Sequence, residues 1–190
     1  MKTPIKVLVV EDSRDDADLL IYALKQAGYE PSCALVQNAR GMRTQLAKQS
    51  WDLVISDFVI PGFGGMAALK VLLDCGQDIP FIIISGKIGE DVAVEALHAG
   101  ADDYLLKDRL QRLGPAIDRV LKEASQKRKR TQAEQALRES EERYRRLVET
   151  CPDAMFIITE GKLVFANPAA ITLLGATSPV DLIGKLLLDL

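Results

Sequence analysis

The stretch Val54–Gly65, VISDFVIPGFGG, carries the strongest indication of the fold. It begins with apolar and β-branched residues, which favour a buried strand. Asp57 ends this run, and Pro61 and three glycines follow it, which is typical of a tight connection. A carboxylate at the end of a buried strand is either a turn-forming residue or a reactive group, and the sequence on both sides bears on that choice.

Similar apolar runs recur on both sides of this stretch and alternate with segments of helical periodicity. Strands that are apolar at nearly every position are buried on both faces, which is typical of a parallel sheet covered by helices. The sequence therefore predicts an α/β fold with a doubly wound, five-stranded parallel sheet and five helices. The predicted strands lie within IKVLVV, a weaker run CALVQ, WDLVIS, PFIIIS and DYLLK.

The predicted helices also have recognisable ends. Ser13, followed three residues later by Asp16, resembles a capping box that opens the first helix. Gly28, Gly76 and Gly100 follow helical segments at positions where a helix is expected to stop. These signals support the alternation of strands and helices.

Composition limits the class of protein. A chain of 190 residues suggests one complete domain with an additional piece, and its net charge of −3 gives no electrostatic reason to expect a nucleic-acid partner. Cys33, Cys75 and Cys151 lack the spacing of a metal site or a disulfide framework, which favours a reducing cytoplasm. The apolar run near the N-terminus is too short for a secretory signal. No run reaches the roughly eighteen apolar residues of a membrane span.

A long, charged helix is predicted from Gln126 onward. Its apolar positions recur at alternating spacings of four and three, which is a heptad seam and predicts a homodimer through this helix. An earlier group, Ile117, Val120 and Ala124, has a similar spacing in a different phase, which predicts a break in the coiled-coil register. The basic run from Lys127 to Arg130 is interpreted as a solvated helix face. The seam residues are Ala133, Leu137, Ser140, Tyr144, Leu147 and Cys151.

The last segment differs from the charged helix in its pattern of residues. AMFIIT and GKLVFA read as two strands joined at Glu160 and Gly161, and a helix is expected to open at Asn167 with Pro168 in its first turn. About forty residues are too few for an independent core. This segment is therefore expected to be part of a larger fold.

Polar residues follow successive strands of the predicted sheet. In a doubly wound sheet, ligands gather at the carboxyl ends of the strands, beside the point where strand order reverses. Crowded carboxylates repel one another, and a hard cation such as Mg²⁺ relieves that repulsion. Asp57 could then act as a nucleophile toward a phosphoryl group, whose oxygens Lys107 and Ser85 would bind. The residues at these strand ends are Glu11, Asp12, Asp57, Ser85 and Lys107.

Each of these residues also has a simpler interpretation. A single carboxylate at a strand end is usually a cap or a turn former, Lys107 alone is a typical surface lysine, and Tyr104 alone a half-buried aromatic. The joint placement of five residues at successive strand ends favours a reactive site. A flavin is disfavoured, because EDSRDD after the first strand would repel its phosphate. His98 has no nucleophile or metal-ligand spacing around it and is expected at the surface.

The region from Met1 to about Ala124 resembles the receiver domain of two-component response regulators, which has a flavodoxin-like fold. The resemblance is carried by the acidic pair Glu11 and Asp12, by DFVIPGFGG with Asp57, by Ser85 with Gly86, and by GADDYLLK with Tyr104 and Lys107. One departure is that Asp108 follows Lys107, where the family usually has proline, so this peptide need not adopt the usual geometry.

The resemblance implies specific roles. Asp57 is the expected phosphoacceptor, and its donor is a histidine kinase or a phosphotransfer protein. Asp12, Asp57 and the backbone carbonyl of Val59 are expected to ligate Mg²⁺, with Glu11 acting through water. Ser85 and Tyr104 are expected to form the switch.

The final segment resembles the first half of a PAS sensory domain, on RYRRLVETCPDAMFIITEGKLVFANPAAITLLGATSPVDLIGK. The predicted organisation is a receiver at 1–124, a helical coiled-coil linker at 125–149 and a partial α+β PAS segment at 150–190. Two functions remain open. The chain is either a Mg²⁺-dependent phosphoaccepting receiver that relays its state through a dimeric helix, or a scaffold for interaction and dimerisation that does not depend on phosphorylation.

Overall fold

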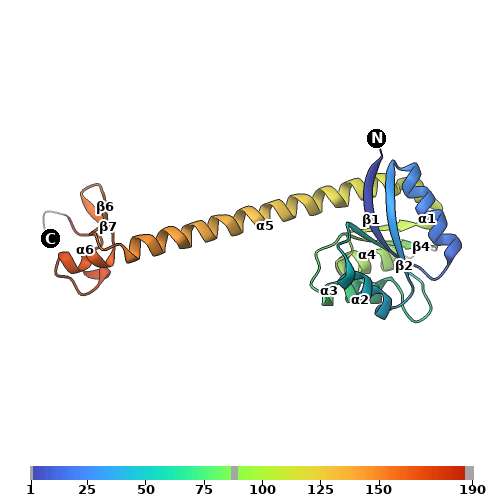
Figure 1. The fold of residues 1–190 in the computed structure, drawn as a ribbon, viewed down its shortest axis with the longest axis horizontal. Helices are drawn as coiled ribbons and strands as arrows, with labels where there is room; N and C mark the ends of the chain where they lie inside the picture. Colours follow the sequence, from blue (N-terminus) through green and yellow to red (C-terminus); the bar gives the residue numbers. More distant parts are fainter. Residues whose placement is uncertain (1, 87–89, 187–190) are drawn as a thin grey trace. The chain divides into compact units, whose positions relative to one another are not determined.

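The computed structural model describes residues 2–86 and 90–186, and these form two compact units, Met1–Arg128 and Lys129–Leu190. The first unit is built on a parallel sheet with strand order β2-β1-β3-β4-β5 (Figure 1). Its strands are β1 Thr3–Val10, β2 Tyr29–Val36, β3 Leu53–Asp57, β4 Phe81–Ser85 and β5 Asp103–Leu106. This confirms the predicted fold class, and β2 is longer than the run CALVQ suggested.

Helices cover both faces of this sheet (Figure 1). Residues of β1 alternate between the faces: Val7 and Val9 lie in one core cluster, and Leu8 and Val10 in the other. The first cluster includes residues of α1 and α5, and the second includes residues of α2, α3 and α4. The helices are α1 Arg14–Gln26, α2 Ala39–Lys48, α3 Gly65–Asp74, α4 Glu90–His98 and α5 Leu113–Thr150, with a 3-10 helix, η1, at Lys107–Arg112.

The start of α5 corrects the interpretation of the first seam. Ile117 and Val120 are fully buried in the core formed with α1 and the sheet. Their spacing reflects packing against the sheet, so they are not a seam for a second helix. The change of phase along α5 follows from this packing, since only the early part of the helix has a core to face.

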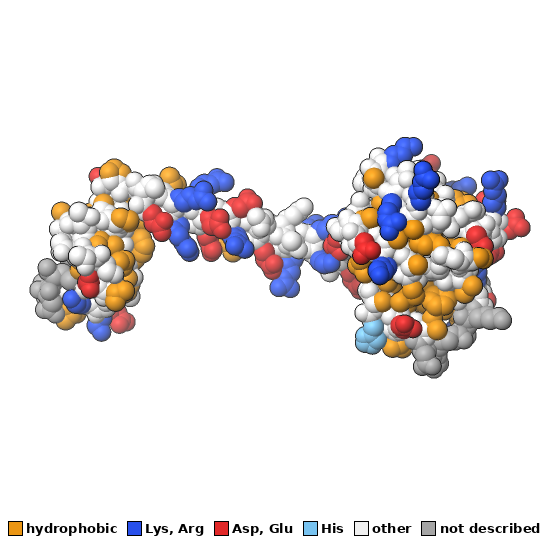
Figure 2. Space-filling model, turned by 90° about the horizontal axis from the view of Figure 1, so that it is seen from below, with side chains coloured by type: hydrophobic (Ala, Val, Ile, Leu, Met, Phe, Trp, Pro, Cys, Tyr) orange, Lys and Arg blue, Asp and Glu red, His pale blue; other side chains and the backbone are white. Residues whose placement is uncertain are grey.

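Beyond Arg128, α5 is highly charged and exposed. Figure 2 shows basic and acidic side chains mixed along this part of the helix, and pairs four residues apart, such as Arg130 with Glu134 and Arg138 with Glu142, form ion pairs. Such pairs stabilise a helix that has little packing of its own. No helix among the described residues is long and apolar enough to cross a membrane.

The second unit ends in a small α+β arrangement. β6 Phe156–Thr159 and β7 Lys162–Ala166 are antiparallel, and α6 Pro168–Leu173 and a 3-10 helix, η2, at Pro179–Asp181 follow them. Glu160 and Gly161 both have positive φ, the backbone that a two-residue hairpin requires. Asn167 caps α6 and Pro168 opens it, as predicted. The local core consists of Leu163, Ala166, Ala170 and Leu182.

Candidate functional site

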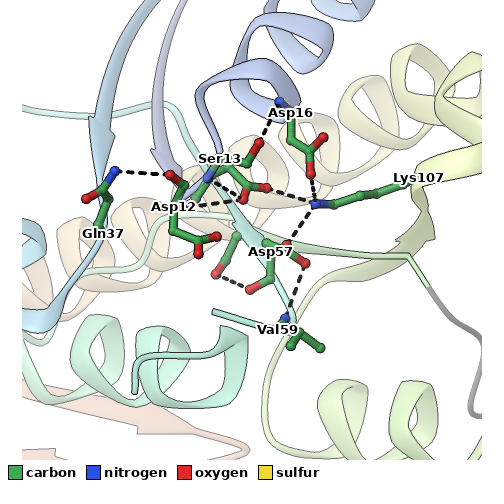
Figure 3. Close-up of polar contacts among 9 residues, drawn as sticks. Asp12, Ser13, Asp16, Gln37, Asp57, Val59 and Lys107 are labelled. Atoms are coloured by element: carbon green, nitrogen blue, oxygen red, sulfur yellow. Dashed lines mark hydrogen bonds and ion pairs between the residues drawn. The ribbon is translucent and has the colours of Figure 1, made fainter. Parts of the chain in front are cut away.

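The acidic residues meet because their strands are neighbours. β1 and β3 run parallel and side by side, so Glu11 and Asp12, just after β1, lie beside Asp57 at the end of β3. One carboxylate oxygen from each of the three lies within 4.8 Å of the others. Glu11 and Asp57 are buried, whereas Asp12 is exposed and its carboxylate bonds to no other described residue (Figure 3). A cluster of hard oxygen donors with one open side suits a divalent cation.

Lys107 occupies the centre of this charge cluster. Its Nζ lies 2.8 Å from Asp57 Oδ2, 3.0 Å from Glu11 Oε2 and 2.5 Å from Asp16 Oδ2 (Figure 3). Lys107 opens η1 directly after β5, so the order of the strands carries it to the same edge of the sheet. Burial alone would lower the pKa of the ammonium, but its bonds to Asp16, Asp57 and Glu11 raise that pKa well above its usual range. Lys107 therefore stays cationic at the site.

Glu11 has a structural as well as an electrostatic part. Its Oε1 accepts the backbone N–H groups of Asp12 and Ser13, at 3.1 Å each. Burial raises the pKa of the Glu11 carboxyl, and the bonds from Ser13 and Lys107 act in the opposite direction. Only half of the predicted capping box forms. Ser13 Oγ accepts a hydrogen bond from the Asp16 N–H, as predicted. The Ser13 N–H donates to Glu11 and not to Asp16, because the Asp16 carboxylate accepts from Lys107.

The connection after Asp57 is tightly folded. The Val59 N–H donates to Asp57 Oδ1 at 3.2 Å, which orients the carboxylate. A Cβ at Gly64 would lie 2.6 Å from the Phe58 carbonyl oxygen, so only glycine fits there. The turn residues of VISDFVIPGFGG thus hold the aspartate in place, and Asp57 is at once the end of a strand and a member of the charge cluster.

Ser85 and Tyr104 lie on the adjacent strands. Ser85 is buried at the end of β4, one residue beyond Ile84, which pairs with Asp57 and accepts the Phe58 N–H at 2.8 Å. The Tyr104 ring on β5 packs edge-on against the Phe58 ring, with 6.5 Å between centroids. Residues 87–89, just after Ser85 and Gly86, lie outside the described residues. His98 is exposed, as predicted.

Asp16 also belongs to this cluster, although its pattern in the sequence did not predict this. The run EDSRDD places several carboxylates near the end of the first strand, but the position of Asp16 three residues after Ser13 suggested a helix cap. Asp16 lies in the first turn of α1, and α1 contacts η1, which begins at Lys107. At the departure from the family pattern, Asp108 lies in η1, and no cis peptide bond occurs among the described residues.

Comparison with known proteins agrees with this geometry. The family model described as "Response regulator receiver domain" matches residues 7–118. The chain belongs to the response regulator receiver domain family. A second family model, described as "PAS domain", matches residues 142–190. The receiver match spans the whole of the charge cluster, from Glu11 to Lys107.

Curated relatives of this receiver include transcriptional regulators. The phosphate regulon transcriptional regulatory protein PhoB of Pseudomonas aeruginosa is 31% identical over 103 residues, which is 53% of this chain and 44% of PhoB. The uncharacterized transcriptional regulatory protein YrkP of Bacillus subtilis is 35% identical over 103 residues, 54% of this chain and 42% of YrkP. Each match thus covers less than half of the relative's own length.

Solved receiver structures share the fold. The signal receiver domain of a signal transduction histidine kinase from Syntrophus aciditrophicus is 31% identical, with a TM-score of 0.52, and the match covers 62% of this chain and 90% of that one. A response regulator receiver domain protein from Clostridium thermocellum is 26% identical, with a TM-score of 0.56 and coverage of 64% and 97%. The chain therefore contains a receiver domain of the two-component type, and a phosphoacceptor role fits this family.

Proposed function

We propose that Asp57 accepts a phosphoryl group from the phosphohistidine of a histidine kinase or a phosphotransfer protein. The observation that carries the proposal is the ion pair of 2.8 Å between Asp57 and Lys107 at the carboxyl edge of the sheet. An oxygen of Asp57 attacks phosphorus and forms an O–P bond. The P–N bond to the partner's imidazole breaks, and the imidazole nitrogen takes the electron pair and then a proton from water.

Lys107 and Ser85 would bind the oxygens of the transferred group. Lys107 supplies a fixed positive charge where negative charge accumulates, and burial strengthens this interaction. Ser85, at the end of β4, would contribute its hydroxyl. Tyr104 would respond to phosphorylation of Asp57, because its ring packs on Phe58, the residue after Asp57. Ser85 and Tyr104 are thus the proposed switch residues.

The acidic cluster fits Mg²⁺. Asp12 and Asp57 would bind the ion directly, the Val59 carbonyl would add a third oxygen, and Glu11 would act through water. When bound, the ion offsets the repulsion among the carboxylates and the incoming phosphoryl oxygens. Asp12 supports this proposal most directly, since its exposed carboxylate makes no bond to another described residue. Asp12→Ala should abolish Mg²⁺ binding in a calorimetric titration, and unchanged affinity would refute this ligand set.

Intact mass spectrometry tests the phosphoacceptor. The chain is incubated with acetyl phosphate and Mg²⁺, and a gain of one phosphoryl group is expected. Asp57→Asn should remove this gain without unfolding the protein, since it relieves carboxylate repulsion. Asp52→Asn is the matched control, because Asp52 lies just before the opposite end of the same strand. Phosphorylation of Asp57→Asn at another residue would contradict the assignment.

A dimerisation scaffold is the second candidate function. Leu137, Tyr144 and Leu147 are 61%, 67% and 61% exposed on one seam of α5, which favours pairing with a second copy of the chain. In the proposed organisation, a receiver at 1–124 passes its state along a linker at 125–149 to the PAS segment at 150–190. Sedimentation velocity should show a dimer that Leu137→Asp disrupts and Arg138→Gln does not. If Asp57→Asn changes neither the dimer nor the behaviour of the linker and the PAS segment, only the scaffold function is supported.

A further inference from the structure

The Lys107 ammonium uses all of its hydrogen-bond donors in this structure. An ammonium group has three N–H donors, and three carboxylates receive them: those of Glu11, Asp16 and Asp57. Figure 3 shows Asp16 approaching the ammonium from α1 and Asp57 approaching it from β3. A phosphoryl oxygen that is to bind Lys107 would be a fourth acceptor. One of the three present bonds must therefore open when the phosphoryl group arrives.

The three partners differ in how easily they can be released. The side chains of Glu11 and Asp57 are only 7% and 9% exposed, so either would become a buried carboxylate with a partner lost. The Asp16 side chain is 41% exposed, and water can replace the lysine there. Glu11 is also held by the N–H groups of Asp12 and Ser13. Asp16 is the partner whose release costs least.

We propose that Asp16 is a positioning residue that holds the Lys107 ammonium in the unphosphorylated state and gives up its bond to the incoming phosphoryl group. This inference rests on the proposed function of Asp57. Asp16 does not touch the reacting atoms and acts only through Lys107. Its effect is to slow phosphorylation, for two reasons. A charge-assisted bond of 2.5 Å must open first, and the carboxylate adds negative charge beside an anionic group.

A purely structural role for Asp16 makes a different prediction. Asp15 and Asp16 are both acidic residues in the first turn of α1, where each carboxylate interacts favourably with the helix dipole. If that were the function of Asp16, Asp15→Asn and Asp16→Asn would behave alike, because each removes one charge from the same turn. The bond from Asp16 to Lys107 distinguishes the two residues. Asp15→Asn is therefore the matched control.

The experiment measures the initial rate of phosphorylation by acetyl phosphate at saturating Mg²⁺, using intact mass. In the reaction, an Asp57 oxygen bonds to phosphorus, the bond from phosphorus to the bridging oxygen breaks, and acetate leaves with the electron pair. Asp16→Asn should react up to about five times faster than the unmodified chain, as expected for the loss of one exposed ion pair. Asp15→Asn should react at the unmodified rate.

A spectroscopic measurement reports the bond itself. The Lys107 ammonium hydrogens, observed by nitrogen-15 NMR, should exchange with water faster in Asp16→Asn and at an unchanged rate in Asp15→Asn. Equal phosphorylation rates in the two variants, or a slower rate in Asp16→Asn, would overturn the inference while leaving the phosphoacceptor in place. An unmodified chain that takes no phosphoryl group would overturn the proposed function and this inference with it.

Discussion

Two strands with almost the same sequence have opposite environments in this molecule. β4 begins Phe81-Ile82-Ile83, and these residues are 1%, 0% and 0% exposed. β6 begins Phe156-Ile157-Ile158, and these are 44%, 56% and 38% exposed. β4 pairs with β3 and β5 and has helices on both faces, whereas β6 pairs only with β7 among the described strands. Burial is therefore set by neighbours in the fold and not by the local sequence.

The contrast bears on how each unit functions. The receiver has a complete core and can hold four charged groups at fixed distances at its edge. The unit that contains β6 presents apolar side chains on an open strand, which is a surface suited to pairing. A rigid site and an apolar edge are thus joined in one chain by α5.

The largest effect is expected from matched phenylalanines. Phe81→Ala should lower the free energy of unfolding by about 3–5 kcal/mol, because it leaves a cavity in a closed core. Phe156→Ala should change it by less than about 1 kcal/mol, because that ring is already half exposed. Urea titration followed by the fluorescence of Trp51, the single, buried tryptophan, measures the effect of Phe81→Ala on the receiver, and hydrogen exchange of residues 155–170 measures the effect of Phe156→Ala on the second unit. Equal losses in the two variants would mean that β6 is covered in solution.

Asn167 provides the next test, since it stabilises the second unit by polar contacts. Its buried side chain accepts the N–H groups of Met155 and Ala170 and donates to three carbonyls, those of Val148, Cys151 and Asp153. Asn167→Ala should cost about 2–3 kcal/mol in local stability, because several buried groups lose partners. Hydrogen exchange of residues 155–170 should accelerate.

The matched control for this prediction is Asn38→Ala, which removes the exposed cap of α2. It should cost about 1 kcal/mol, because water can replace an exposed cap. Trp51 should report no change in the receiver for Asn167→Ala. A loss of receiver stability in that variant would show that the two units unfold together.

Periodicity and residue type were sufficient to predict the receiver sheet and the position of its site. Strands apolar at every position imply burial on both faces, and this placed Glu11, Asp57 and Lys107 at one edge. The hairpin at Glu160 and Gly161 was likewise predictable, because a two-residue turn has strict requirements. Local rules work where a single local cause dominates.

Side-chain partners were less predictable. The sequence could not show whether the Asp16 carboxylate accepts from Lys107 or from the Ser13 N–H, since either donor can bind a carboxylate. The packing of α1 determines which of the two bonds forms. Ile117 and Val120 were assigned to a seam for the same reason: a heptad spacing does not reveal whether the opposing surface is a helix or a sheet. These errors all concern contacts between residues far apart in the chain.

A smaller effect is expected within the receiver, at its edge strand. The Tyr29 hydroxyl on β2 donates to the Asp118 carboxylate on α5. Tyr29→Phe should lower the free energy of unfolding by about 1–2 kcal/mol, whereas Tyr22→Phe, which alters an exposed ring on α1, should leave it unchanged. An equal loss in both variants would exclude the hydrogen bond as the cause.

The Tyr29 contribution should also depend on pH. Burial, together with the bond to Asp118, raises the pKa of the Tyr29 hydroxyl in the folded protein. Its stabilising contribution is therefore fully present below the usual tyrosine pKa of about 10, and it is lost as the pH rises above that value. The difference between the unmodified chain and Tyr29→Phe should be constant from pH 7 to about pH 9 and should shrink in more alkaline buffer.

The smallest effect concerns α5 where the receiver core no longer covers it. Lys127 Nζ and an Arg128 guanidinium nitrogen bind the Asp78 carboxylate and carbonyl, each at 2.7 Å. The Lys127 and Asp78 side chains are both more than half exposed, so Asp78→Asn should change the free energy of unfolding by less than about 0.5 kcal/mol. Hydrogen exchange of the helix near Lys127 should nevertheless rise several-fold, because few buried contacts oppose fraying there. Salt should mimic the substitution by screening the pair. Asp74→Asn, at the exposed end of α3, should change neither quantity, and if it accelerates exchange equally, the cause is net charge and not the bond.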